Sequence, residues 1–285
     1  MRVVTVGNAM VDVVAAVPRL PSRGGDVLAS GGRLEVGGGG YRAIAAARAA
    51  GADTVYLGRI GTGPLGDLVA GALSREGVPA PLPRVPGADT GFVLTAVEAD
   101  GERTFITVPG AESADPGDGP PPVRAGDAVH VHGYGLVAPG RAERVAEIVA
   151  ALPAHATVLL DPGPFGADAP PAALERLLDR VDWWSGNAAE ARAATGEDVD
   201  DAARTLATRV RRGAVVRRGA EGCVVVVRGA APVRLTAPEV RAVDTTGAGD
   251  AHVGTFLALL AAGGDPVAAA AAANAAAARL VSRLR

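Results

Sequence analysis

The sequence predicts an α/β fold with a doubly wound, mostly parallel sheet flanked by helices, because strands and helices alternate along most of its 285 residues. The expected strands are short apolar runs, and the expected helices carry Ala, Leu or Ile at helical spacing. Two β-rich segments, 12–36 and 90–108, interrupt this alternation and predict a small second sheet. We therefore expect one domain over 1–285, with these two segments forming the added sheet.

The first predicted element is residues 2–7, an apolar strand that ends in glycine. The further elements are helix 39–51, strand 54–57, helix 64–76, strand 128–132, helix 140–151, strand 156–161, helix 171–178, strand 181–185, helices 187–195 and 199–211, and strand 213–217. Within the second β-rich segment, runs 90–95 and 103–108 flank Asp100-Gly101, a dipeptide typical of a hairpin turn.

Composition excludes several classes of function. A net charge of −3 and a pI near 5.8 give no general attraction to nucleic acid or to an anionic membrane. The single cysteine, Cys223, excludes an internal disulfide and suits a reducing cytoplasm. Asp12 breaks the N-terminal apolar run, so we expect no signal peptide, and the C-terminal apolar stretches are too short to span a bilayer. These features predict a cytoplasmic protein.

All 28 basic residues are arginine, and the sequence contains no lysine. This excludes a P-loop lysine, a protein-kinase strand lysine and any Schiff-base mechanism. If the chain binds phosphate, then backbone amides, arginine and metal must carry the opposing charge.

The run 244–250, DTTGAGD, is the most informative motif and leads into the apolar stretch 256–262, a predicted buried helix. Gly247 and Gly249 allow backbone N–H groups to converge at the helix N-terminus, where the dipole favours an anion. Asp250 would lie in the first helical turn, where a carboxylate commonly does no more than satisfy the dipole. With two Thr, two Gly and a second Asp beside it, the motif favours a base that takes a proton during phosphoryl transfer.

This run resembles the signature of the ribokinase-like (PfkB) family of sugar and nucleoside kinases, and blocks at 7–12, 36–48 and 187–190 resemble other family motifs in the expected order. The resemblance implies a ribokinase-like fold in which the small sheet is a lid over the sugar site and sometimes a homodimer interface. It also implies ATP as phosphoryl donor and Mg²⁺ as cofactor.

Site roles follow from the resemblance. Asp250 would be the base, with the backbone of Gly247, Ala248 and Gly249 holding the developing charge. Asp12, which could equally be an ordinary turn residue, would bind sugar hydroxyls. The remaining substrate positions are Gly37, Gly38 and Gly39, where backbone can approach a polyol, and Tyr41, an aromatic where the family usually has Asn.

On the nucleotide side, Asn187 and Glu190 resemble the family's N-x-x-E motif, which organises Mg²⁺ through water. The same pair also fits a helix capping box, which is a sufficient structural explanation. The other implied nucleotide contacts are Arg217, Gly219, Gly222, Thr246 and Asn274. For Arg217, a solvated surface position is the simpler alternative.

Residues 61–66 form a literal G-x-G-x-x-G, which on its own suggests dinucleotide binding. The motif is not in the first strand–helix unit, and the region that should supply an acidic ribose ligand reads Pro83-Arg84-Val85-Pro86. Family members have a similar G-x-D-x-x-G here. Gly63 replaces that Asp, so its contribution is missing or is supplied elsewhere.

Many members of the resembled family are activated by potassium beside the anion hole. Asp244 and Thr246 match one half of that site. The sequence stops at 282–285, so most of the second half is absent, and Arg283 or Arg285 could supply positive charge instead. We therefore expect weak or no potassium dependence.

We conclude from the sequence that the chain is an ATP-dependent kinase that phosphorylates a hydroxyl group of a small sugar. A nucleoside kinase of the same fold is the first alternative, suggested by Tyr41. A catalytically silent sugar-binding regulator is an alternative of another class, and a nicotinamide-dependent oxidoreductase based on residues 61–66 is a weaker one.

Overall fold

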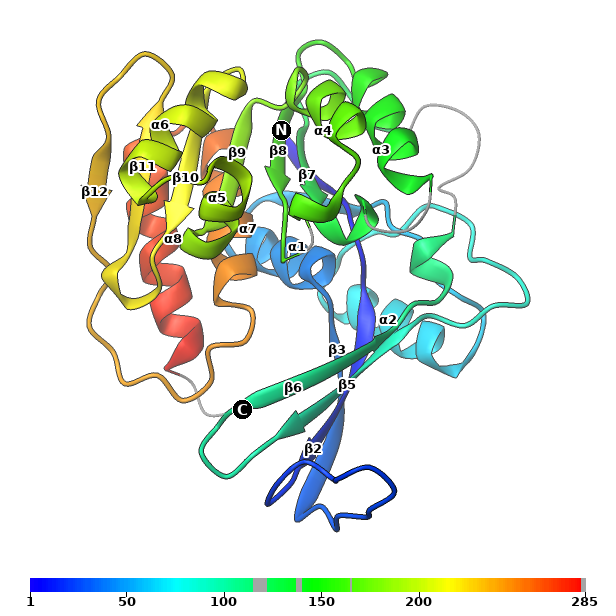
Figure 1. The fold of residues 1–285 in the computed structure, drawn as a ribbon. Coiled ribbons are helices and arrows are strands. Elements are labelled where there is room, and N and C mark those ends of the chain that lie inside the picture. The colour runs from blue at the N-terminus through cyan, green and yellow to red at the C-terminus, as the bar shows by residue number, and fades with distance from the viewer. Residues whose placement is uncertain (115–121, 137–139, 165, 283–285) are drawn as a thin grey trace.

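A mostly parallel sheet forms the centre of the molecule (Figure 1). The computed structural model describes residues 1–114, 122–136, 140–164 and 166–282. The eight strands lie in the order β12-β11-β10-β9-β8-β7-β1-β4, and only the β10–β11 and β11–β12 pairs are antiparallel. Their bounds are β1 Arg2–Val6, β4 Asp53–Tyr56, β7 Ala128–His132, β8 Thr157–Asp161, β9 Trp183–Asn187, β10 Gly213–Arg217, β11 Cys223–Val227 and β12 Val233–Leu235. This architecture confirms the predicted sheet.

Helices cover both faces of this sheet, and each face has its own apolar core. The helices are α1 Gly39–Ala49, α2 Pro64–Arg75, α3 Arg141–Ala150, α4 Pro171–Leu178, α5 Ala188–Thr195, α6 Val199–Arg209, α7 Ala248–Ala261 and α8 Pro266–Val281. Side chains of α3, α4, α5 and α6 fill one core, and those of α1, α2, α7 and α8 fill the other. Trp183 and Trp184 show the alternation of a strand, because the first packs edge-on against Phe256 of α7 and the second enters the opposite core.

Most predicted boundaries agree with the structure to within two residues. Strand β9 begins later than predicted because the Val181 N–H still bonds back to the Leu177 carbonyl at the end of α4. None of the helices within the described ranges is long and apolar enough to cross a membrane.

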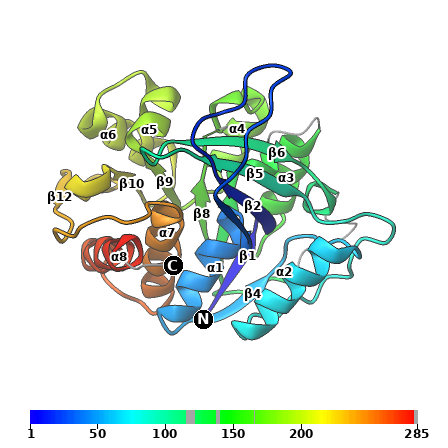
Figure 2. The same ribbon diagram turned by 90° about the horizontal axis from the view of Figure 1, so that it is seen from below.

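The two β-rich segments pair with each other, as the sequence predicts, in a four-stranded sheet of order β3-β2-β5-β6. Its strands are β2 Met10–Ala16, β3 Gly31–Gly37, β5 Phe92–Val97 and β6 Arg103–Val108. Asp100-Gly101 closes the β5–β6 hairpin, and Gly101 adopts a φ of 88° that favours glycine. This sheet, which we call the lid sheet, lies below the large sheet in Figure 1 and crosses it in Figure 2.

The G-x-G-x-x-G run at 61–66 leads into α2, where a carboxylate from elsewhere in the chain caps the helix. The carboxylate of Asp89 accepts the N–H groups of Leu65 and Gly66 at 3.1 and 2.8 Å. A Cβ at Gly63 would collide with that side chain. Asp89 therefore supplies a carboxylate at the place where Gly63 lacks one, and it occupies the helix end that a dinucleotide would need.

Candidate active site

Four neighbouring strands of the large sheet each end in a polar side chain. The last residues of β7, β8, β9 and β10 are His132, Asp161, Asn187 and Arg217. The strands are parallel, with His132 in register with Asp161 and Asn187 in register with Arg217. All four side chains therefore meet at the carboxyl edge of the sheet, where open α/β folds bind ligands.

A pocket of about 280 Å³ lies over this edge. The four strand-end residues form one wall, and residues 245–250 at the start of α7 form another. The lid sheet contributes Asp12 from β2 and Arg103 from β6. The pocket therefore joins the strand ends, the turn before α7 and the lid sheet, as the sequence predicts for a covered site.

The turn before α7 has the geometry of an anion site. Gly247 is the N-cap with a φ of 80°, which a residue with a side chain adopts only under strain. No side chain of the described residues caps this N-terminus. The first N–H groups of a helix have no partner within the helix, and the dipole favours an anion beside them. The Ala248 N–H is held by the Thr245 carbonyl at 3.2 Å, so an anion here would bind the neighbouring amides of the turn.

Two arginines flank this turn from opposite sides. A Cβ at Gly247 would lie 2.9 Å from the Arg42 side chain, and one at Gly249 would lie 3.5 Å from the Arg217 guanidinium. Arg42 belongs to α1 and Arg217 to β10. The positive charge that the lysine-free sequence requires is therefore present at the turn.

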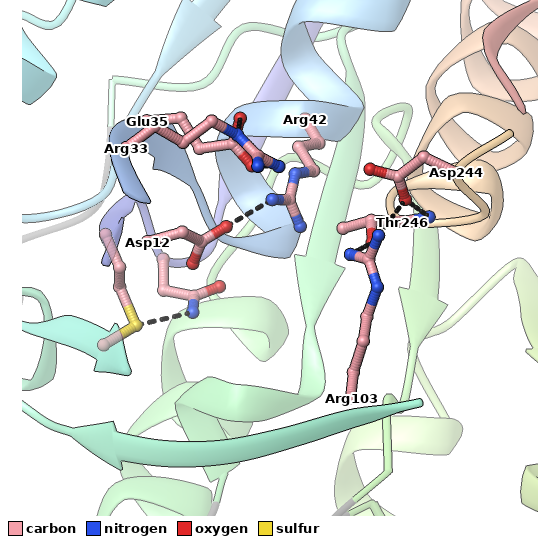
Figure 3. A network of polar contacts seen from close by, with 9 residues as sticks. Asp12, Arg33, Glu35, Arg42, Arg103, Asp244 and Thr246 are labelled. Atoms are coloured by element: carbon pink, nitrogen blue, oxygen red, sulfur yellow. Dashed lines mark hydrogen bonds and ion pairs between the residues drawn. The ribbon is translucent and has the colours of Figure 1, made fainter. Parts of the chain in front are cut away.

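A third arginine reaches the turn from the lid sheet (Figure 3). Arg103 Nη1 donates to the hydroxyl of Thr246, and Nη2 lies 2.7 Å from Asp244 Oδ1. The two arginines that the sequence suggested for this charge, Arg283 and Arg285, lie outside the described residues.

Asp250 lies in the first turn of α7, as predicted, and faces a mixed set of charges. A ring nitrogen of His132 and one carboxylate oxygen each of Asp161 and Asp250 all lie within 4.8 Å of one another. Burial raises the pKa of Asp250; the His132 ring opposes this, the Asp161 carboxylate adds to it, and Arg42 and Arg217 lower it. A raised pKa makes this carboxylate a better proton acceptor near neutral pH than an ordinary aspartate.

On the lid side of the pocket, Asp12 forms an ion pair with Arg42 (Figure 3). Both side chains are largely buried, with exposures of 11% and 19%. A Cβ at Gly37 would collide with the Asp12 carboxylate, and one at Gly39 would collide with the His132 ring. These glycines therefore leave room for two pocket side chains. Gly38 and Gly39 line the pocket, whereas Gly37 lies behind Asp12.

Tyr41 is not among the residues that line the pocket, and the predicted substrate contact at this position stays a prediction. Its ring packs against the apolar core beneath α1. Burial raises its pKa, and the charge of Glu76 adds to this, whereas Arg75 and Arg42 oppose it. The next residue along the helix, Arg42, lines the pocket instead.

Asn187 and Glu190 form the predicted capping box of α5. The Asn187 side chain accepts the Glu190 N–H at 2.8 Å, and the Glu190 carboxylate accepts the Asn187 N–H at 2.7 Å. Both residues also line the pocket. The Arg217 side chain is only 12% exposed rather than solvated, and it lies 3.4 Å from Asp161 and 3.5 Å from Glu190.

Three predicted nucleotide contacts lie outside the pocket. Gly219 and Gly222 belong to the connection between β10 and β11, where both adopt positive φ. Asn274 is buried in α8, and its amide donates to the carbonyls of Leu235 and Thr236 at 3.3 and 3.4 Å. In this structure Asn274 thus ties α8 to the chain after β12.

Among the charged residues and histidines of the pocket, His132 and Asp161 were noted in the sequence as strand residues without an assigned role, and Arg42 and Arg103 were not singled out. A usable signal existed for the two that end strands, because consecutive parallel strands that end in polar residues bring them together. Arg42 and Arg103 gave no comparable signal.

Residues 1–284 match the model of the pfkB family carbohydrate kinases. The ribokinase of Arabidopsis thaliana is 28% identical over 275 residues, which cover 91% of this chain and 70% of that protein. An uncharacterised sugar kinase of Escherichia coli K12, YegV, is 30% identical over 268 residues, covering 92% of this chain and 82% of its own.

Solved structures of sugar and nucleoside kinases are also similar to this chain. The Arabidopsis ribokinase complexed with ribose and ATP superposes with a TM-score of 0.83 at 26% identity, over 99% of this chain and 93% of that one. The adenosine kinase of Sinorhizobium meliloti gives a TM-score of 0.85 at 26% identity, over 99% and 94%. The predicted fold class is therefore confirmed.

Proposed function

This chain belongs to the pfkB family of carbohydrate kinases, and we propose that its pocket transfers the γ-phosphoryl group of ATP to a hydroxyl group of a small sugar, with Asp250 as the base. An ATP-dependent sugar kinase is what the family and the relatives indicate. The observation that supports this chemistry most is the position of Asp250, a carboxylate with a raised pKa in the first turn of a helix whose N-terminus has no side-chain cap among the described residues.

In the proposed mechanism the acceptor lies on the lid side, beside Asp12 and the 38–39 turn. Asp250 takes the proton of the attacking hydroxyl, and the amides at 247–250 hold the transferred group. Arg42 and Arg217, on either side of the turn, offset the phosphoryl charge with donors of fixed geometry. The lid sheet excludes water from the reacting phosphate.

The nucleotide side of the pocket has residues that fit Mg²⁺. Burial raises the pKa of Glu190, and the Asp161 carboxylate raises it further, although Arg217 partly compensates. A divalent cation would relieve the effect of the Asp161 carboxylate on Glu190, and Mg²⁺ prefers such oxygen ligands. We propose that Asn187 and Glu190 hold Mg²⁺ through water, where it would neutralise charge on the ATP phosphates.

Replacement of the base tests the mechanism. Asp250→Asn should lower kcat by about 10²–10⁴, the usual contribution of a positioned general base, with little change in folding. Asp265→Asn is a matched control, because Asp265 caps the N-terminus of the neighbouring helix α8 and lies outside the pocket. An Asp250→Asn enzyme that keeps more than roughly a third of the wild-type kcat would remove Asp250 from this role.

The pH dependence gives an independent test. Because the base must be deprotonated, kcat/KM should fall on acidification through the pKa of Asp250, at a pH above the ordinary value of 3.8. The Asp250→Asn variant should lose this acid limb. A limb that persists unchanged in the variant would assign it to another group.

A nucleoside acceptor is the second candidate, and one observation favours it. A second cavity of about 280 Å³ adjoins the pocket, and the two share Asn8, Met10, His132 and Tyr134 as walls. It could hold a base attached to the sugar. Rates of ATP-dependent transfer over a panel of free sugars and nucleosides separate the two, since a nucleoside kinase should prefer nucleosides by kcat/KM.

We also propose that a second copy of the chain covers the outer face of the lid sheet. Leu34, Leu94 and Ile106 are 60%, 41% and 61% exposed, and they lie in one row across β3, β2, β5 and β6 with Val13 between the first two. Such a row is self-complementary across a two-fold axis. Leu94→Glu should convert a dimer to a monomer in light scattering, and a monomeric wild type would reject the proposal.

A further inference from the structure

Arg103 is the described residue that ties the lid sheet to the turn before α7 by an ion pair (Figure 3). Arg103 begins β6, whose hydrogen-bonded partner is β5 of the same sheet. Its guanidinium bonds Thr246 through Nη1 and Asp244 through Nη2, although 143 residues separate Arg103 from Thr246. A guanidinium holds two acceptors in a fixed fork, so this contact sets geometry as well as charge.

The two residues that Arg103 bonds are also bonded to each other. Asp244 Oδ1 accepts the Thr246 N–H at 2.8 Å, which folds the chain into the turn that precedes Gly247. The chain between β12 and α7 contains no helix or strand, and the N–H groups of Val243 and Asp244 bond to the Val281 carbonyl of α8. Arg103 therefore contributes two contacts to a turn that lies outside any helix or strand.

The charge of Asp244 makes its partner important. Burial would raise the pKa of this carboxyl, but the N–H and hydroxyl of Thr246 and the guanidinium of Arg103 lower it to about 2. Its side chain is only 12% exposed. Asp244 is thus a largely buried anion, and Arg103 is a cation that pairs with it. Because Arg103 belongs to β6, any movement of the lid sheet away from α7 would carry Arg103 with it.

We propose that Arg103 is a positioning residue, which reaches the turn before α7 only when the lid sheet is closed. Through Asp244 and Thr246 it holds the phosphate-binding turn in its anion-binding form, so that phosphoryl transfer is enabled when the lid lies over the acceptor. This inference rests on the proposed function of the pocket. It adds a coupling between lid closure and the far wall of the site.

The chain offers a matched control in the same sheet. Arg33 on β3 is 46% exposed and pairs with Glu35 of its own strand at 3.1 Å, so its ion pair stays within the lid sheet. Arg33→Gln removes the same charge from the lid without touching the turn. Circular dichroism and thermal melting of every variant establish that it is folded.

Kinetics give the first readout. Arg103→Gln should lower kcat by roughly tenfold or more while the KM values for sugar and ATP change less than about threefold, since the turn acts on the transferred group. Arg103→Lys should recover part of kcat, and millimolar guanidinium chloride should partly restore Arg103→Ala. Arg33→Gln should match the wild type and show no such rescue.

Hydrogen exchange gives a readout that needs no activity. Without ligands, amides of 92–108 should exchange faster in Arg103→Gln than in wild type and Arg33→Gln, because the lid has lost its tie to the core. A wild-type kcat in Arg103→Gln, or unchanged lid exchange, would overturn the proposal. If wild-type protein transfers no phosphate to any acceptor, the proposed function fails, and the exchange result still decides the contact.

Discussion

The unusual acidity of Asp244 predicts a measurable, pH-dependent share of stability. The pKa of its carboxyl is about 2 in the folded chain against an ordinary 3.8, a difference of about 1.8 units. At 1.36 kcal/mol per unit this corresponds to about 2 kcal/mol. Because the folded-state pKa is depressed, the contribution is complete well above pH 4 and is lost as pH falls through about 2.

Asp244→Asn should therefore lower the free energy of unfolding by about 2 kcal/mol at pH 7 and by about 1 kcal/mol at pH 3. Asparagine keeps the shape and one carbonyl acceptor for Thr246 but loses the charge that faces Arg103. Urea unfolding of both proteins at the two pH values, followed by circular dichroism, measures the difference.

Asp53→Asn provides the control, because the Asp53 side chain is 83% exposed and its ion pair with Arg48 is long at 3.8 Å. We expect a change within about 0.5 kcal/mol at either pH. If Asp244→Asn costs the same at pH 3 as at pH 7, then the charge of Asp244 is not what stabilises the turn, and the reasoning fails.

Three further predictions concern the lid sheet and the acceptor. Tyr41→Asn should leave the ratios of kcat/KM across a sugar panel unchanged, whereas Arg42→Asn should change them, because Arg42 rather than Tyr41 lines the pocket. Saturating sugar with a non-hydrolysable ATP analogue should slow amide exchange in 12–36 and 90–108, and unchanged exchange would exclude closure over the site. Replacing sodium by potassium should raise activity less than about tenfold, a gap of 1.4 kcal/mol, because Arg103 already faces Asp244.

The sequence was sufficient for the layers of the fold because they depend on local patterns. Strand–helix alternation follows from hydrophobic periodicity, and the β5–β6 hairpin follows from Asp100-Gly101 between two β-rich runs. The start of α7 could also be predicted, since Gly247 and Gly249 mark a turn and Asp250 lies in the first turn of the helix. Each of these features is decided within about ten residues of chain.

On the acceptor side, the sequence did not show which of two neighbouring residues of α1 lines the pocket. Successive side chains on a helix point about 100° apart, so neighbouring positions face different surroundings. The glycine block at 37–40 placed the helix correctly but did not say whether Tyr41 or Arg42 would face the pocket. The buried face of α1, which includes Ala43, Ile44 and Ala47, fixes that rotation, and it becomes known only when the helix packs on the sheet.

The sequence could not show that a residue distant in the chain supplies a group missing from a motif. The missing carboxylate at Gly63 is replaced by Asp89, from the chain that leads into β5. Nothing near Gly63 marks Asp89 as its replacement, because their proximity depends on how the connection after α2 returns to the start of that helix.

The absence of lysine bears on how the pocket works as a unit. A lysine would bring a point charge to the phosphate, whereas an arginine fork holds two acceptors at once. Three arginines link the 244–250 turn to other parts of the pocket: Arg42 pairs with Asp12 of β2, Arg103 extends from β6 of the same lid sheet, and Arg217 pairs with Asp161 at the strand ends. A movement of any one wall therefore changes the charge and geometry at the same few amides. If this pocket carries out the proposed phosphoryl transfer, the lid sheet, the strand ends and the turn must all be in place before the transferred group is stabilised, which would favour transfer to the sugar over transfer to water.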